Sequence, residues 1–198
     1  MYTRREKEIE AMKELIISAA NEIVAKEGFD SLSIRKIANK IEYSPSIIYH
    51  YFKDKEEILN IVMRNGYMKI VSAVSKSDME NLPPIEKLKR MTKNYIEEAL
   101  NMPDEFLAAQ MNRSPQALKH TSYLYKGASR EKPALMALSK CLKDIYYNID
   151  DNQIELKSQI IAASTMGVIL KLIIERDIDE KYKQELINYF IEEVILKI

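Results

Sequence analysis

The chain has 198 residues, of which 46% are hydrophobic, so it can build one large or two small domains around apolar cores. Its 30 basic side chains balance its 30 acidic ones, which excludes a protein that binds nucleic acid through bulk positive charge. Cys141 is the single cysteine, so an intrachain disulfide is excluded and a reducing, cytoplasmic location is expected.

The sequence shows no sign of a membrane-spanning or secreted protein. No apolar run approaches the length that spans a bilayer, and the charged N-terminus lacks the apolar core of a secretory signal. Only four glycines occur, and no segment sustains a period-two alternation of apolar and polar residues. We therefore expect an all-α protein without a membrane partner.

The first predicted helix ends before Gly28. Its apolar residues recur at positions i, i+3 and i+4 and form one stripe: Met12, Leu15, Ile16, Ala19, Ala20, Ile23 and Val24. Such a stripe is typical of a helix that buries one face in a small core.

Residues 33–55 predict two short helices joined by a tight turn. The first begins after Ser33, an N-cap residue, and its apolar residues fall on one face: Ile34, Ile37, Ala38 and Ile41. The second begins with Ser44 at the cap and Pro45 at the first helical position. It is expected to bury Ile47, Ile48 and Tyr51 and to leave four residues outward: Pro45, Ser46, Tyr49 and His50.

That outward face suits the major groove of DNA, because small polar residues start the helix and an aromatic hydroxyl follows one turn later. Residues 33–55 also carry five basic and two acidic side chains, a net charge of +3 in a neutral chain. The local charge favours contacts with phosphates.

Later segments are also predicted to be helical. A long helix runs from Lys55 to the mid-seventies, and residues 75–84 form a boundary that ends in two prolines. Prolines then divide the chain into segments near 85–101, 104–112, 115–127 and 131–148, followed by helices near 152–176 and 180–197. We expect a first domain over 1–54, a connecting helix over about 55–77 and a second domain over 78–198.

The last two predicted helices are apolar on more than one face, so each must be covered on more than one side. Either they are ordinary core helices of a monomer, or an identical subunit covers them. A small-residue patch at Ala163 and Gly167 favours close approach of another helix. We predict a homodimer with these interface residues: Ile160, Ala163, Ser164, Gly167, Leu186, Tyr189 and Phe190.

The stretch SLSIRKIANKIEYSPSIIYHYFKDKEEIL, with Tyr49-His50-Tyr51-Phe52 and the following Lys55–Leu59, resembles the DNA-binding signature of TetR-type transcriptional regulators. The resemblance covers about residues 9–62. It implies an N-terminal three-helix helix-turn-helix domain and a C-terminal helical domain for ligand binding and dimerisation. One position departs from the pattern: Glu42 stands where the inter-helix turn usually carries glycine, and a positive φ there costs roughly 1 kcal/mol.

The resemblance assigns a phosphate contact to the hydroxyl of Tyr49. We extend the predicted DNA contacts to this set: Ser33, Lys36, Ser44, Pro45, Ser46, Tyr49, His50, Lys53 and Lys55. Thr3, Arg4 and Arg5 are expected to form a flexible arm that reaches the adjacent groove.

An effector pocket is also implied, although the resemblance transfers no pocket residue. Methionine and tyrosine line adaptable pockets well, and the second half of the chain is rich in both. Candidate lining residues are Met91, Tyr95, Phe106, Met111, Tyr123, Tyr146 and Met166, with plain core packing as the alternative for each.

Signals for catalysis are poor. The chain has two histidines and no glycine-rich phosphate loop, so we expect no enzyme, no cofactor and no metal site. The predicted function is a repressor released from a palindromic operator by a small, largely apolar effector, with activation as the other regulatory mode. A helical carrier or scaffold without DNA binding, and a helical enzyme with an unrecognised carboxylate site, are alternatives from other classes.

Overall fold

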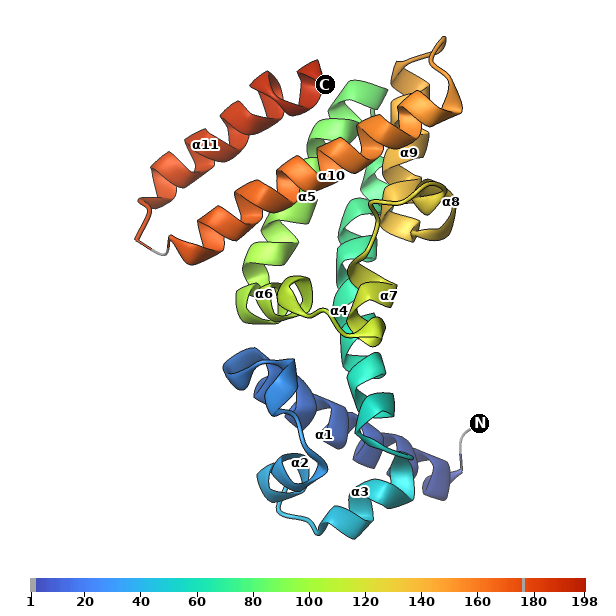
Figure 1. Ribbon diagram of the computed structural model, residues 1–198, viewed down its shortest axis with the longest axis vertical. Helices are drawn as coiled ribbons and strands as arrows, with labels where there is room; N and C mark the ends of the chain where they lie inside the picture. Colours follow the sequence, from blue (N-terminus) through green and yellow to red (C-terminus); the bar gives the residue numbers. More distant parts are fainter. Residues whose placement is uncertain (1–2, 176) are drawn as a thin grey trace. The chain divides into compact units, whose positions relative to one another are not determined.

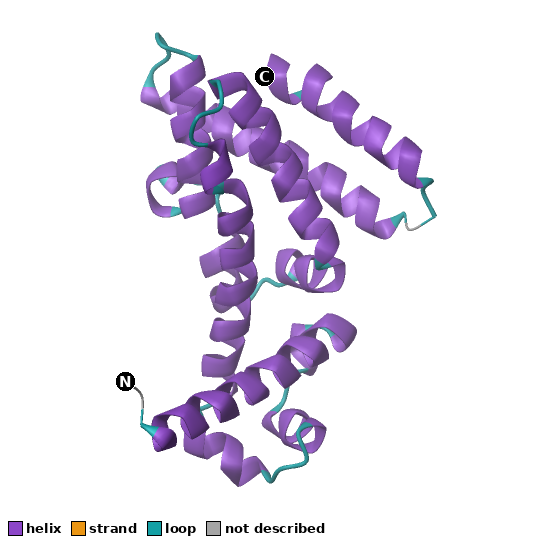
Figure 2. Ribbon diagram, turned by 180° about the vertical axis from the view of Figure 1, so that it is seen from behind, coloured by secondary structure: helices purple, strands orange, loops and turns teal. Residues whose placement is uncertain are grey.

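The computed structural model describes residues 3–175 and 177–198, and these residues form helices joined by loops, with no strand among them (Figures 1 and 2). The expected all-α class is confirmed. The α-helices are α1 (Arg4–Glu27), α2 (Ile34–Lys40), α3 (Pro45–Tyr51), α4 (Lys55–Val74), α5 (Pro84–Asn101), α6 (Pro103–Met111), α7 (Pro115–Thr121), α8 (Ala128–Glu131), α9 (Pro133–Ile145), α10 (Asp151–Ile174) and α11 (Glu180–Glu193). Three short 3₁₀ helices follow α1, α4 and α11: η1 (Phe29–Ser31), η2 (Ser77–Met79) and η3 (Ile195–Lys197).

Prolines start most of the later helices, as the sequence predicts, but two predicted segments differ. The segment expected over 115–127 ends at Thr121, and the segment expected over 131–148 is divided between α8 and α9. Pro133 explains the second difference, because a proline at the first turn of α9 cannot continue the helix before it.

The chain divides into two compact units. The first comprises the described residues up to Tyr67 together with Asp104–Thr121, and the second comprises Met68–Pro103 and the described part of Ser122–Ile198. Helices α6 and α7 therefore belong to the first unit, because Ala108, Ala109 and Ala117 pack against its core. The functional division predicted after residues 54 and 77 stays a prediction.

The first unit encloses a small apolar core. Helix α1 contributes most of its predicted stripe, with Met12 partly buried, but Leu15 is 44% exposed and lies outside the core. Helix α2 contributes Ile37 and Ala38, and α3 contributes Ile48, all fully buried. This small core holds α2 and α3 in a fixed relation to each other.

The expected flexible arm at residues 3–5 is wrong. Thr3 is the N-cap of α1, and its hydroxyl accepts a hydrogen bond from the backbone N–H of Glu6 at 3.3 Å. The Glu6 carboxylate in turn accepts from the backbone N–H of Thr3 at 2.7 Å, which completes a capping box and lowers the pKa of Glu6. Arg4 and Arg5 are consequently the first helical residues rather than a mobile tail.

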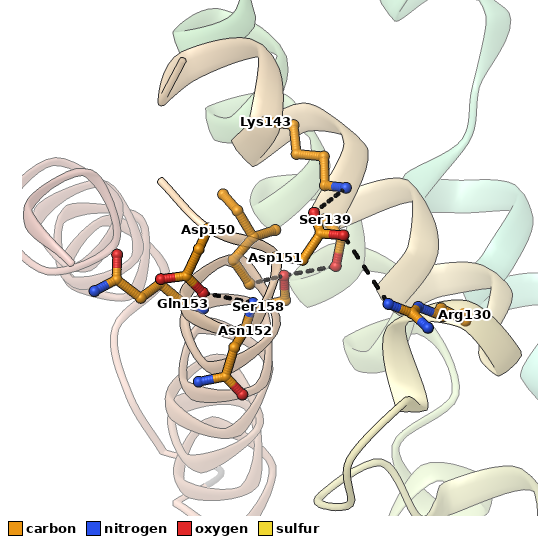
Figure 3. Close-up of polar contacts among 9 residues, drawn as sticks. Arg130, Ser139, Lys143, Asp150, Asp151, Asn152, Gln153 and Ser158 are labelled. Carbon is orange, nitrogen blue, oxygen red and sulfur yellow. Dashed lines mark hydrogen bonds and ion pairs between the residues drawn. The ribbon is translucent and has the colours of Figure 1, made fainter. Parts of the chain in front are cut away.

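The second unit is built on α5, α9 and α10, which pack against one another, while α11 and η3 pack on α5. Figure 3 shows how polar contacts join the start of α10 to α8 and α9. Asp151 forms ion pairs with Lys143 at 2.6 Å and with Arg130 at 4.0 Å, and the hydrogen bond from Lys143 lowers the pKa of Asp151. Deeper in the unit, the hydroxyls of Ser139 and Ser158 lie 2.7 Å apart.

Helix α10 corrects the expectation that no apolar run approaches the length that spans a bilayer. It has 24 residues, and an 18-residue window within it has a mean hydropathy of 1.4. By length and composition alone, this helix could cross a membrane. Its buried polar side chains include Ser158 and Thr165, whose hydroxyls donate to backbone carbonyls of the same helix. Packing against α5 and α9 accounts for this composition equally well, because a helix covered on several sides by protein is apolar on several faces.

Candidate nucleic-acid interface

Helix α2 begins at a serine cap and is joined to α1 by two ion pairs. The Ser33 hydroxyl accepts from the backbone N–H of Lys36 at 3.2 Å, so its predicted role as a cap is confirmed. The Lys36 ammonium lies 2.5 Å from a Glu27 carboxylate oxygen, and Lys40 lies 2.7 Å from Glu22. The positive charge expected from these two lysines is thus shared with acidic residues of α1.

The turn between α2 and α3 is a Schellman motif with a glutamate at its left-handed position. The backbone N–H of Tyr43 donates to the Ala38 carbonyl at 2.9 Å, and that of Glu42 donates to the Asn39 carbonyl at 3.3 Å. Glu42 has φ 61°, and it is the one non-glycine residue with positive φ among the described residues. The turn therefore keeps the geometry that glycine normally provides, and the Glu42 backbone carries the strain.

Helix α3 buries one face and exposes the other. Ile48 is fully buried, Ile47 and Tyr51 are half-buried, and the outward residues predicted from the sequence are all exposed. Pro45 occupies the first helical position, but the Ser44 hydroxyl does not cap the backbone. It instead lies 2.7 Å from the Ser46 hydroxyl, so the two serines form a polar pair at the start of the helix.

Tyr49 is the most exposed aromatic residue of α3, with 58% of its surface accessible. His50 is also exposed, and its ring meets Tyr51 edge to face with centroids 5.1 Å apart. Because Tyr49 is exposed, its hydroxyl is available to a phosphate or another acceptor. The phosphate contact itself stays a prediction.

The start of α4 is capped by acidic residues. Asp54 accepts from the backbone N–H of Glu57 at 2.9 Å, and the Glu57 carboxylate accepts from the backbone N–H of Lys53 at 2.7 Å. The Lys53 side chain is exposed, whereas Lys55 is half-buried and lies 3.9 Å from Glu56. These carboxylates weaken the attraction that the helix start would otherwise have for phosphate.

Arg35 is a further candidate contact that the predicted set does not include. Arg35 is exposed in the first turn of α2 and forms no ion pair with a described residue, unlike its neighbour Lys36. Its position two residues after the Ser33 cap was visible in the sequence. The pairing of Lys36 with Glu27 was not, because those residues are nine apart along the chain and meet only through the packing of α2 on α1.

The predicted pocket residues are divided between the two compact units. Phe106 and Met111 belong to the first unit, and the other five belong to the second. Within the second unit the Tyr123 hydroxyl lies 3.8 Å from the Met166 sulfur, and burial raises the pKa of Tyr123. Tyr146 instead stacks with the Lys157 ammonium 4.9 Å above its ring, while Met111 is 63% exposed.

Helices α10 and α11 carry exposed apolar side chains. Ile160, Gly167, Leu186 and Tyr189 are exposed, whereas Ala163 and Ser164 are half-buried. Two further exposed residues, Leu156 and Ile174, continue this stripe on α10. Phe190 is buried within its own chain, so its predicted place on an interface finds no support.

Known proteins resemble this chain in sequence over its N-terminal part and in fold over nearly its whole length. The family described as "Bacterial regulatory proteins, tetR family" matches residues 16–62, the segment that contains α2 and α3. An HTH-type transcriptional regulator of Haemophilus influenzae is 31% identical over 83 residues, 42% of this chain and 44% of that protein. The "Fatty acid metabolism regulator protein" of Bacillus subtilis is 32% identical over 73 residues, 37% of this chain and 38% of that protein.

The aligned segments thus span less than half the length of these two relatives. The solved structure of the fatty acid degradation regulator FadR from Bacillus halodurans shares the fold of the whole chain. It has a TM-score of 0.70 at 20% identity, over 90% of this chain and 93% of the other. The matched segment, which contains the helix-turn-helix, is thus similar to the tetR family of bacterial regulatory proteins, and the likeness to the solved structure extends the shared fold over nearly the whole chain.

Proposed function

We propose that the protein is a ligand-responsive transcriptional regulator that binds double-stranded operator DNA in the cytoplasm. The observation that carries the proposal is the outward face of α3, where Pro45, Ser46, Tyr49 and His50 are exposed while Ile48 anchors the opposite face. A recognition helix needs this arrangement, because base edges and phosphates are read by side chains that the protein core leaves free. No catalytic step is part of the proposal.

The regulator acts as a homodimer through α10 and α11. Leu156, Ile160, Ala163, Gly167 and Ile174 recur at spacings of three, four and seven, so they share one side of α10. Exposed apolar residues in such a stripe mark a surface that another protein covers. Two recognition helices then bind half-sites about one helical turn apart, roughly 34–36 Å, or a multiple of it, which predicts a palindromic operator.

A small, largely apolar effector releases the operator. The effector changes DNA affinity only to the extent that it binds one conformation of the dimer better than the other. Because the B. subtilis relative is named as a fatty acid metabolism regulator, fatty acids and their derivatives are the first ligand class to screen. Repression is the mode we propose, and a transcription assay in which the unliganded protein raises expression from the operator would reveal activation instead.

A binding-site selection from random duplexes tests the proposal. The purified chain is expected to enrich a palindrome. Tyr49→Glu is the matched control, because it places a negative charge on the DNA-facing side of α3 without touching the core. Flat enrichment by the wild-type protein would instead support a helical carrier that binds an apolar molecule without DNA.

A further inference from the structure

We propose that Glu42 is a specificity-determining residue of the DNA interface. Its carboxylate accepts a hydrogen bond from an exocyclic amino group in the major groove, on a cytosine or adenine of the strand that it faces, and its charge disfavours guanine or thymine at that position of the strand. The inference rests on the proposed function, since it concerns how that same interface chooses its sequence.

The first argument is the conformation of Glu42. It occupies the left-handed position of the Schellman turn at φ 61°, where glycine is free of strain. Residues held in such conformations concentrate at functional sites, where the side chain supplies something that glycine lacks. The strain at Glu42 is therefore a reason to ask what its side chain does.

The second argument is the placement of that side chain. Residues 42–46 are all exposed, so Glu42 precedes Ser44 and Pro45 on the same uncovered segment that leads into α3. Among the described residues, none forms a hydrogen bond or an ion pair with the Glu42 carboxylate. The nearest lysine along the chain, Lys40, lies 2.7 Å from Glu22 instead. Glu42 is thus an unpaired anion on the surface proposed to meet DNA.

The outward side chains of α3 make few specific contacts with base edges, which leaves this role to Glu42. The outward residues of α3 include no arginine, lysine, asparagine or glutamine, which are the side chains that make bidentate contacts with guanine or adenine. A carboxylate can accept from the N4 amino group of cytosine, and any exocyclic amino group offers the same donor. When guanine or thymine stands at that position of the strand that Glu42 faces, the carboxylate meets the acceptor oxygen O6 or O4, which repels it, and the amino group lies on the opposite strand. Glu42 therefore provides discrimination that α3 does not supply through paired hydrogen bonds.

The test compares sequence selection and affinity for wild type, Glu42→Gly and Glu42→Gln. Wild type is expected to enrich cytosine or adenine at one position in each half-site, and Glu42→Gly is expected to lose that preference. The ratio of operator to random-duplex affinity should fall by roughly tenfold per half-site in Glu42→Gly, as expected for a good base contact. Glu42→Gln keeps the side-chain length, so it should retain part of the base preference while binding random duplexes more tightly.

The increase in affinity of the Glu42 variants for random duplexes should be largest at low salt. It should disappear near 1 M salt, where the Debye length is about 3 Å. A structural role for Glu42 would not produce this salt dependence. If Glu42→Gly selects the wild-type sequence with an unchanged affinity ratio, the inference is overturned while the proposed function stands. If wild type binds no duplex at all, the proposed function itself fails. Circular dichroism and thermal unfolding confirm that both variants are folded.

Discussion

The hydroxyl of Tyr49 lies on the outward face of α3. Tyr49 is 58% exposed, so the loss of one oxygen leaves the core of the first unit unchanged. Tyr49→Phe is expected to weaken operator binding by about 1 kcal/mol per subunit, the net value of a hydrogen bond, or somewhat more because the phosphate is charged. Fluorescence anisotropy with a selected operator measures the change.

Tyr147→Phe is the matched control for this measurement, because Tyr147 is 87% exposed and lies in the second unit. It should leave operator affinity unchanged. Equal affinities for wild type and Tyr49→Phe would show that the Tyr49 hydroxyl contacts no phosphate.

Burial suppresses the reactivity of the Cys141 thiol. It is 1% exposed, its S–H donates to the Pro84 carbonyl at 3.3 Å, and burial raises the pKa of its thiol to about 11. Because the thiolate is the reactive form, a thiol reagent at pH 8 should label the folded protein at least about a hundredfold more slowly than the urea-unfolded chain. Stopped-flow absorbance records both rates, and similar rates would contradict the buried environment.

Helices α9 and α10 are joined by a buried pair of hydroxyls. Ser158 is fully buried, and its hydroxyl donates to the Ile154 carbonyl at 2.7 Å. Since a serine has one hydroxyl hydrogen, Ser139 must be the donor in the 2.7 Å contact between the two hydroxyls. The pair thus has a defined direction from α9 to α10 (Figure 3).

Ser139→Ala is expected to lower the free energy of unfolding by about 1 kcal/mol, because it removes one buried hydrogen bond. Ser158→Ala should cost more, up to about 3 kcal/mol, because it leaves the buried Ser139 hydroxyl without its acceptor. Urea unfolding of both single variants and the double variant yields their coupling energy. Ser72→Ala, at an exposed position of α4, is the control, and additive effects at positions 139 and 158 would show that the two hydroxyls are not coupled.

The assembly of two chains decides whether the proposed operator can be bound. Ile160 is 54% exposed on α10, so Ile160→Asp leaves the fold of a single chain intact but places two charges in the proposed interface. The variant is expected to be monomeric in sedimentation experiments. Its operator affinity should fall by 10²-fold or more, because the second half-site no longer benefits from linkage to the first.

Met136→Asp serves as the control, since Met136 is a 47% exposed apolar residue on α9 in the same unit. It should leave the oligomeric state unchanged. If the Ile160→Asp variant remained dimeric, the apolar stripe on α10 would not be part of the dimer interface.

Much of the fold could be predicted because its signals are local. Ser33, Pro45 and the two-proline boundary before α5 each act on backbone atoms within a few residues, and the structure confirms the helix starts at these positions. The outward face of α3 was predictable for the same reason, since helical periodicity fixes which residues share a side. The sequence did not predict that Ser44 fails to cap α3, because the Ser44 hydroxyl pairs with the Ser46 hydroxyl instead of a backbone N–H.

The sequence by itself determined the helical class, the order of the helices and the outward residues of α3, because periodicity, caps and prolines act over short distances. Only the tertiary structure decided which charges remain unpaired: Glu22 and Glu27 on α1 engage Lys40 and Lys36, whereas Arg35 and Glu42 stay exposed. It also decided that α6 and α7 pack with the first unit and that Phe190 lies inside while Tyr189 lies outside. These outcomes depend on contacts between residues far apart in the chain, which no local pattern encodes.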